Sequence, residues 1–325
     1  MGSMTTPLDR RRLGQSEASW SPIGLGTWQF SQGHGLIGRF WPTLTQDYIT
    51  AIVKATVDGG ISWFDTAEAY GRGQSERALA MALETLHVDV DTISIATKWW
   101  PLLRSSHHLQ HSIGARLQAL NQHPIALYQI HQPFARSSIE SQMRAMASLL
   151  DHGLIKQAGV SNFTASQMVL AHRTLKSCGH ALASNQVHYN LLHRNIESNG
   201  ILANARELGI SLIAYSPLAQ GLLTGKFHQG TASPRGFRRW SPQFRPEVLR
   251  TTAPLIRAMQ DLAERYEVEV SQVALNWVIT SAGDTVFAIP GASSPKQAAA
   301  NSKAMGWALT HDEWAMLSDL STNFR

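Results

Sequence analysis

Four side chains that can carry out acid–base chemistry stand at comparable places in the chain, each at or just after a short apolar run. Asp65 ends the run "ISWFD", Lys98 ends "ISIATK" and His131 ends "IALYQIH". Tyr70, five positions after Asp65, carries a phenol, which is a poor acid at neutral pH unless a neighbouring cation stabilises the phenolate. Lys98 can supply that charge, Asp65 can hold the ammonium, and His131 can hydrogen-bond a carbonyl or share the proton. Such a set can protonate an oxygen as negative charge develops on it, which carbonyl reduction by hydride requires.

A hydride donor is missing from this set, because none of the four side chains can supply one, and a cofactor is therefore needed. Later apolar runs end in groups that suit such a cofactor. Ser161, Asn162 and Gln186 offer a hydroxyl and amides that can bind a carboxamide, and Tyr215 offers a flat ring for stacking. Each residue alone has a simpler explanation, such as a helix cap, a solvated charge or packing. The hypothesis of a reductase site rests on all of these side chains lying around one common site.

They can share one place if the apolar runs are neighbouring strands of one sheet. The runs are short, rich in β-branched residues and separated by helical patterns, which is typical of repeated βα units and a parallel sheet. The predicted strands are Ile23–Trp28, Ile61–Phe64, Ile93–Lys98, Ile125–His131, Ile155–Ser161, Ala183–Tyr189, Ser211–Tyr215 and Val286–Pro290.

The helical patterns between these runs complete the prediction of fold class. They cover Gln46–Asp58, Ser75–Leu86, His107–Asn121, Ser137–His152, Ala165–Ser177, Glu197–Leu208 and Pro254–Ser281, the last broken near Tyr266–Val270. Eight such units in a chain of this length predict an α/β (β/α)₈ TIM barrel. A doubly wound sheet is rejected, because no helix follows the glycines of "GLGTWQF" directly. Catalytic groups of a barrel belong at the carboxyl ends of its strands.

Two segments lie outside the repeat. Residues 11–22 predict an N-terminal β-hairpin that plugs the barrel's amino-terminal end. Residues 219–250 predict a long Gly-, Pro- and Arg-rich loop after the seventh strand, and a loop of this length is usually functional. With Arg and Trp interleaved over a predicted cofactor site, this loop is interpreted as a lid. Residues 1–325 are expected to form a single domain, apart from residues 1–4, "MGSM", which resemble a cloning remnant.

Composition excludes several other classes of protein. The chain of 325 residues is 43% hydrophobic and 16% charged, with a net charge of +5. The chain has no run of basic residues interleaved with aromatics, so nucleic-acid binding is not predicted. No apolar stretch reaches the ~18 residues that a membrane span needs. Cys178 is the only cysteine, which favours a reducing, cytoplasmic location. His107 and His111 are spaced as metal ligands but lack a third one, so no metal site is predicted.

The motifs that surround these residues resemble the aldo-keto reductase family along essentially the whole chain. They occur in the family's order and spacing: "GLGTW", "WFDTAEAYGRGQSE", "ATKW", "IHQP", "GVSNF", "NQVHYN", "AYSPLAQGLLTGK" and "IPGASSPKQAAAN". The resemblance implies a (β/α)₈ barrel that binds NAD(P)H across its carboxyl-terminal face. It also implies reversible reduction of an aldehyde or ketone, with a small-molecule carbonyl or alcohol as the substrate and the hydride taken from the nicotinamide.

The resemblance assigns roles to individual residues. It makes Tyr70 the general acid, Asp65 and Lys98 the pair that tunes its pKa, and His131 the residue that orients the substrate. The implied cofactor-binding residues are Gly26, Thr27, Trp28, Asp65, Ser161, Asn162, Gln186, Tyr215, Ser216, Pro217, Leu218, Gly221, Lys226, Arg238, Gly291, Ser293, Gln297 and Asn301. The predicted substrate pocket consists of Trp28, Tyr70, Trp99 and His131. Ser75 and Glu76 are expected to cap the second helix.

The sequence leaves alternatives open for the cofactor and for the class of activity. The family's usual habit favours NADPH, but the places where many members carry a basic and an acidic residue hold Ser293, Gln297 and Ala300 here. NADH therefore remains an alternative, as do Lys296, Arg235, Arg238 or Arg239 as partners of a 2′-phosphate. A second hypothesis is a cofactor-binding regulatory subunit resembling potassium-channel beta subunits. His131 argues against it, because those subunits depart from the family at that position. The natural substrate and the oligomeric state are not predicted.

Overall fold

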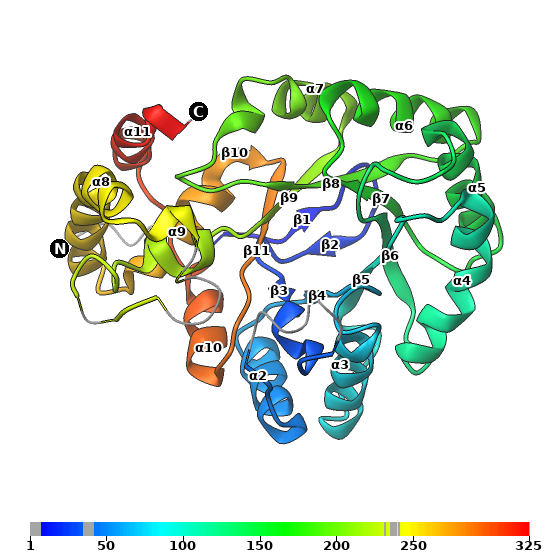
Figure 1. Ribbon diagram of the computed structural model, residues 1–325, viewed down its shortest axis with the longest axis horizontal. Coiled ribbons are helices and arrows are strands. Elements are labelled where there is room, and N and C mark those ends of the chain that lie inside the picture. Colours follow the sequence, from blue (N-terminus) through cyan, green and yellow to red (C-terminus); the bar gives the residue numbers. More distant parts are fainter. Residues whose placement is uncertain (1–7, 35–41, 231, 235–238, 240, 325) are drawn as a thin grey trace.

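Eight parallel strands close on themselves into a barrel. The computed structural model describes residues 8–34, 42–230, 232–234, 239 and 241–324. The strands pair in the order β11-β9-β8-β7-β6-β5-β4-β3, and backbone bonds then join the two edges. Gly24 N donates to Ala288 O at 2.9 Å, and Gly26 N donates to Pro290 O at 3.1 Å. Helices surround the strands (Figure 1), so the predicted (β/α)₈ barrel is confirmed.

The eight predicted strands are all present, with shifts at their ends. They are β3 (Leu25–Gly26), β4 (Trp63–Asp65), β5 (Ser94–Trp99), β6 (Ile125–Ile130), β7 (Ala158–Ser161), β8 (Leu182–His188), β9 (Ser211–Tyr215) and β11 (Val286–Ile289). The first is shorter than expected, because a 3₁₀ turn already begins at Trp28. Thr27 N donates to Asp65 O at 2.9 Å as the chain leaves the sheet. A short strand that was not predicted, β10 (Ser281–Asp284), precedes β11.

The helices follow the predicted pattern closely until the long loop. They are α2 (Gln46–Asp58), α3 (Gln74–Thr85), α4 (Ser106–Ala119), α5 (Ile139–Asp151), α6 (Ala165–Ser177), α7 (Ile201–Leu208), α8 (Pro246–Arg265), α9 (Val270–Thr280), α10 (Pro295–Lys303) and α11 (His311–Leu320). The predicted break is confirmed, since α8 ends at Arg265 and α9 begins at Val270. The expected start of α8 at Pro254 was wrong: Pro246 occupies the first turn and Pro254 lies inside the helix. Helix α11 was not predicted.

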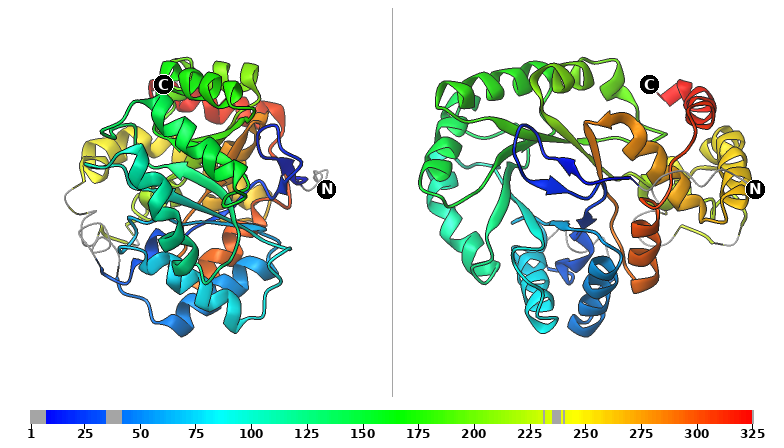
Figure 2. Two further views of the ribbon diagram at one scale, coloured as in Figure 1. Left: turned by 90° about the vertical axis from the view of Figure 1, so that its right-hand side faces the viewer. Right: turned by 180° about the vertical axis from the view of Figure 1, so that it is seen from behind.

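The N-terminal hairpin covers the end of the barrel from which the strands start. Strands β1 (Arg11–Arg12) and β2 (Ser19–Trp20) pair antiparallel and lie across the barrel (Figure 2, right-hand view). The Trp20 ring lies 4.8 Å from the Trp63 ring, and Trp63 packs edge-on against Phe287 at 6.2 Å. Arg11 donates to Val286 O at 2.8 Å and anchors the hairpin to β11. The predicted plug is confirmed. Because the hairpin covers this end of the barrel, the open end is the one formed by the carboxyl ends of the strands.

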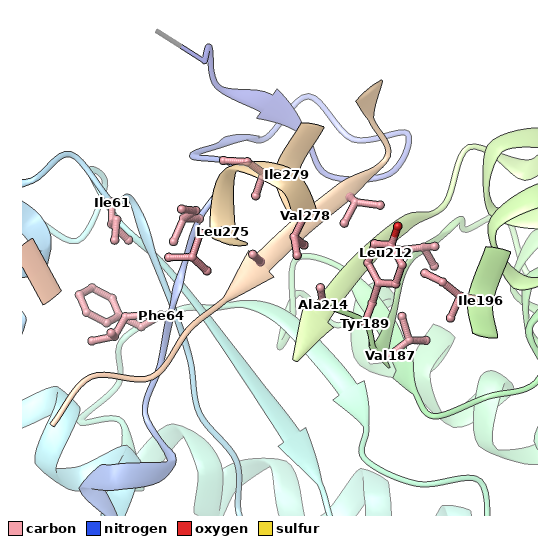
Figure 3. Packing of buried hydrophobic residues seen from close by; sticks show 14 of the residues in the cluster. Ile61, Phe64, Val187, Tyr189, Ile196, Leu212, Ala214, Leu275, Val278 and Ile279 are labelled. Carbon is pink, nitrogen blue, oxygen red and sulfur yellow. The ribbon is translucent and has the colours of Figure 1, made fainter. Parts of the chain in front are cut away.

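Apolar side chains between the strands and the outer helices form the larger part of the core. Figure 3 shows part of this cluster, in which Phe64 of β4 and Leu212 of β9 share the interior with Leu275 and Val278 of α9. All four side chains are fully buried. The strand ends are therefore carried by a closely packed scaffold.

None of the helices in the described part of the chain is long and apolar enough to span a membrane.

Substitution of Trp20 by Ala should lower the free energy of unfolding by about 3–5 kcal/mol, because it empties the aromatic contact beneath the barrel. Trp20 is 1% exposed, whereas Met81 on α3 is 51% exposed. Urea unfolding measures the change, and Met81→Ala is the control, expected to stay within about 0.5 kcal/mol of the parent. Equal losses for both variants would show that the hairpin does not support the barrel.

Candidate active site

A cavity of about 950 Å³ opens at the carboxyl ends of the strands. Tyr70 and His131 line it, together with most of the residues predicted to bind a cofactor: Gly26, Thr27, Trp28, Asp65, Ser161, Asn162, Gln186, Tyr215, Ser216, Pro217, Leu218, Gly221, Lys226, Gly291, Ser293, Gln297 and Asn301. Arg235 and Arg238, which were considered above as partners of a 2′-phosphate, lie outside the described residues. Residues 1–4 lie outside them too. The barrel thus brings distant segments of the sequence to one surface.

The ion pair between Lys98 and Asp65 lies at the floor of this cavity. Lys98 Nζ donates to Asp65 Oδ1 at 2.5 Å and to Thr66 O at 2.9 Å. The other carboxylate oxygen accepts hydrogen bonds from Gln186 at 2.8 Å and from Gln129 at 3.3 Å. Both charged side chains are essentially inaccessible to solvent. Burial works to lower the pKa of Lys98, but Asp65 and Tyr70 together more than offset it, so the pKa of Lys98 is raised and the group stays an ammonium at neutral pH.

Tyr70 lies directly above this pair. Its hydroxyl is 3.5 Å from Lys98 Nζ, and its ring is stacked against Trp28 with centroids 6.1 Å apart. The turn that follows β4 places it there, since Tyr70 N donates to Ala67 O at 3.0 Å. Burial raises the pKa of Tyr70, and Lys98 only partly offsets that effect. The phenol is therefore protonated at neutral pH and can donate, although the expected net lowering of its pKa by Lys98 is not seen.

His131 stands edge-on to Tyr70, with ring centroids 5.7 Å apart. Burial, assisted by the Lys98 charge, lowers the pKa of His131 well below its usual value. The imidazole is therefore neutral at physiological pH. Within the described residues its Nδ1 atom is buried and has no hydrogen-bond partner. A neutral imidazole beside a proton-donating phenol can orient a carbonyl oxygen without adding a second positive charge.

Tyr215 forms a flat aromatic surface beside these groups. Its hydroxyl donates to Asn162 Oδ1 at 3.0 Å, and Asn162 Nδ2 donates to Ser161 Oγ at 3.1 Å. His188 was not predicted to belong to the site, yet it lines the cavity and stacks on Tyr215 at 5.1 Å with an interplanar angle of 7°. The alternation of side chains along β8 would have found it, because Gln186 and His188 are two residues apart and face the same way.

The predicted place of Trp99 in the substrate pocket was wrong. Trp99 is fully buried on the helix side of β5, where its Nε1 donates to His108 Nδ1 at 3.0 Å. Trp100 lines the cavity instead. The reason is the period of a strand: Lys98 faces the barrel interior, so its neighbour must face outward and the next residue inward again.

The far end of the cavity carries positive charge and a helix start. Lys226 and Lys296 both line it, and Pro295 begins α10. Ser293 N donates to Gln297 Oε1 at 2.8 Å, which orders the turn before this helix. Ammonium groups and a helix N-terminus favour an anionic ligand.

A buried polar network supports the floor from the side of α3. The expectation that Ser75 and Glu76 cap this helix was wrong, because the N-cap is Gly73 and makes no side-chain cap bond. Ser75 Oγ instead donates to Thr27 O at 2.7 Å. Glu76 is fully buried and accepts hydrogen bonds from Thr97 and Arg116, both at 2.6 Å. Burial raises the pKa of Glu76 to about 7.

Fold and site together define a barrel oxidoreductase. The chain matches the model of the Aldo/keto reductase family over residues 22–322, and it belongs to that family. It is 38% identical to an uncharacterized oxidoreductase of Mycobacterium tuberculosis over 94% of this chain and 90% of that protein. It is 33% identical to the chloroplastic pyridoxal reductase of Arabidopsis thaliana, over 92% and 82% of the two chains. The structure of the glycerol dehydrogenase from Gluconobacter oxydans aligns with a TM-score of 0.84 at 28% identity, covering 97% and 96%.

Replacement of Glu76 by Gln should remove part of the pH dependence of stability. Because the folded-state pKa of Glu76 is raised from 4.5 to about 7, the unfolded chain loses this proton first as pH rises. The wild-type free energy of unfolding should therefore fall across this window relative to the Gln variant. Urea unfolding of both proteins at several pH values gives the difference. Parallel curves for the two proteins would contradict the assigned protonation.

Proposed function

We propose that this protein is an NADP(H)-dependent reductase of aldehydes or ketones, working reversibly, with Tyr70 as proton donor. The observation that carries the proposal is the convergence of a protonated phenol, a buried ammonium and a neutral imidazole at one cavity floor. An aldo-keto reductase from Klebsiella pneumoniae, solved in complex with NADP and acetate, aligns over 97% of this chain and 96% of that one. Its TM-score is 0.75 at 25% identity, and it supports the choice of cofactor.

The donor groups of the cavity fit a nicotinamide dinucleotide. The hydroxyl and amides of Ser161, Asn162 and Gln186 suit a carboxamide, and the Tyr215 ring suits a flat heterocycle. At the opposite end, the ammonium groups of Lys226 and Lys296 suit phosphates. The volume of about 950 Å³ falls within the range of ligand-binding clefts. When bound, the cofactor supplies or accepts the hydride, which no side chain here can do.

The chain's own residues manage the proton. The Tyr70 hydroxyl donates it to the carbonyl oxygen as negative charge develops there, and the same group takes it back in alcohol oxidation. Lys98, 3.5 Å away, stabilises the phenolate that remains. Asp65 keeps Lys98 charged and in place. His131 donates a hydrogen bond to the same carbonyl oxygen and orients the substrate.

Substitution of Tyr70 by Phe should lower kcat by about 10²–10⁴-fold, because it removes the proton donor and little else. NADPH oxidation with a reactive aldehyde such as a nitrobenzaldehyde measures turnover, and quenching of protein fluorescence measures cofactor binding. Cofactor affinity is expected to stay within about twofold of the parent, since the Trp28 and Tyr215 surfaces remain.

Full activity in the Tyr70→Phe variant would contradict the assignment of the acid. Tight cofactor binding without repeated turnover in the wild-type protein would instead favour the regulatory-subunit hypothesis. No feature of the site supports that second hypothesis, because the proton-donating set is complete.

Replacement of Lys296 by Ala should weaken the use of NADPH more than that of NADH. A charge-assisted hydrogen bond to the 2′-phosphate is worth about 1.5–3 kcal/mol, which predicts at least a tenfold fall in kcat/KM for NADPH. Lys303→Ala is the matched control, since Lys303 lies on the same helix but does not line the cavity. A wild-type enzyme that uses both cofactors equally well would contradict the choice of NADPH.

A further inference from the structure

The carboxylate of Glu68 is placed close to the catalytic groups but takes no part in the proton transfer. Glu68 lies between Asp65 and Tyr70 in the loop after β4, and its side chain is only 14% exposed. One of its oxygens accepts a hydrogen bond from Arg104 Nη1, and the other accepts one from Trp100 N at 3.1 Å. Its backbone N–H also donates to Lys98 O at 3.1 Å. Glu68 thus joins the loop of the proton donor to the loop that follows β5.

Arg104 extends this connection to a third loop. Its Nη1 atom donates to Trp100 O at 3.1 Å as well as to Glu68. Its own carbonyl oxygen accepts a hydrogen bond from Arg136 N at 2.8 Å, in the loop after β6. Both backbone polar groups of Trp100 are therefore held by one ion pair. The pair thus anchors the backbone of Trp100 directly beyond the end of β5.

Trp100 begins an aromatic surface that leads out of the cavity. Its ring is edge-on to His131 at 5.2 Å and edge-on to Phe134 at 5.8 Å. Phe134 does not line the cavity and is 47% exposed, so the aromatic surface continues from the cavity wall at Trp100 to the outside of the protein. Across the floor, Trp28 stacks on Tyr70. Aromatic rings thus flank the place between Tyr70 and His131 on both sides.

We propose that Glu68 and Arg104 are positioning residues that hold Trp100 against the carbonyl site, and that the wall so formed selects carbonyl compounds carrying an aromatic or bulky apolar group. The inference rests on the proposed reductase function and deepens it. Loss of the negative charge of Glu68 weakens its bond to Arg104, and with it the hold on the backbone of Trp100, so that the ring is freer to move. Binding of a substrate that contacts the ring then suffers. Tyr70 and Lys98 keep their places, because Tyr70 N still donates to Ala67 O and Lys98 still pairs with Asp65.

The first test compares two aldehydes in wild type and Glu68→Gln, with NADPH as cofactor. The KM for nitrobenzaldehyde should rise about tenfold and kcat fall by no more than about twofold, because a shift of the order of 1 Å misplaces only the wall. Propanal has only a small alkyl group and offers little surface to the Trp100 ring, so its KM should change by less than about twofold. Equal effects on both aldehydes would overturn the proposal. A wild-type protein that reduces neither aldehyde would instead overturn the proposed function.

Glu313→Gln is the matched control for a purely structural effect. Glu313 is 11% exposed and, like Glu68, accepts hydrogen bonds from an arginine, Arg265, and from a backbone N–H, that of Thr310. It lies on α11, away from the cavity lining. This variant should lower thermal stability to a similar extent and leave the ratio of the two KM values unchanged. A changed ratio in Glu313→Gln would show that the Glu68 effect is general and overturn the proposal.

Trp100→Ala tests the wall without touching the ion pair. It should reproduce the selective rise in KM for nitrobenzaldehyde and keep the affinity for NADPH, which fluorescence quenching reports. Combined with Glu68→Gln it should add little, because both changes remove the same wall. An unchanged KM in Trp100→Ala, or fully additive effects in the double variant, would overturn the assignment. This variant also serves if Glu68→Gln fails to fold.

Discussion

The buried ion pair between Lys98 and Asp65 is the interaction on which the rest of the site depends. Removing two charges from water costs several kcal/mol per ion, and only close pairing with further hydrogen bonds offsets that cost. The pair lies 2.5 Å apart, and Thr66, Gln129 and Gln186 satisfy the remaining groups. These partners come from different strands of the barrel, so the charges can be buried only when the sheet has closed.

The closed sheet also decides how the proton donor behaves. Tyr70 is partly buried beside Lys98, and burial has the larger effect on its pKa, so the resting state is a phenol rather than a phenolate. Lys98 stabilises Tyr70 most strongly after the proton has left, because the ammonium then faces the full negative charge of the phenolate. The low pKa of His131 has the same origin, namely burial beside a cation. Burial thus sets the resting protonation of both neighbours, opposed by the Lys98 charge at Tyr70 and assisted by it at His131.

The sequence allowed the barrel, the hairpin and most of the cavity lining to be predicted. Apolar runs of strand length and helical periods are local signals, and they identified all eight barrel strands and the break between α8 and α9. Errors arose where a local rule had two outcomes. Pro254 can begin a helix or lie inside one, and the structure chose Pro246 as the start. Helix α11 lies in a segment for which no pattern was recognised.

What the sequence by itself determined is the set of groups and the order in which they follow the strands, because strand period and strand ends are properties of neighbouring residues. The strand period places Trp100, and not Trp99, on the same side of β5 as Lys98, but only the closed barrel decides that this side faces the cavity. Nor did the sequence reveal His188 behind Tyr215, or the link from Glu68 to Arg104 and Trp100. Those contacts join strand ends and loops that are far apart in sequence, and only the pairing of neighbouring strands in the barrel brings them together.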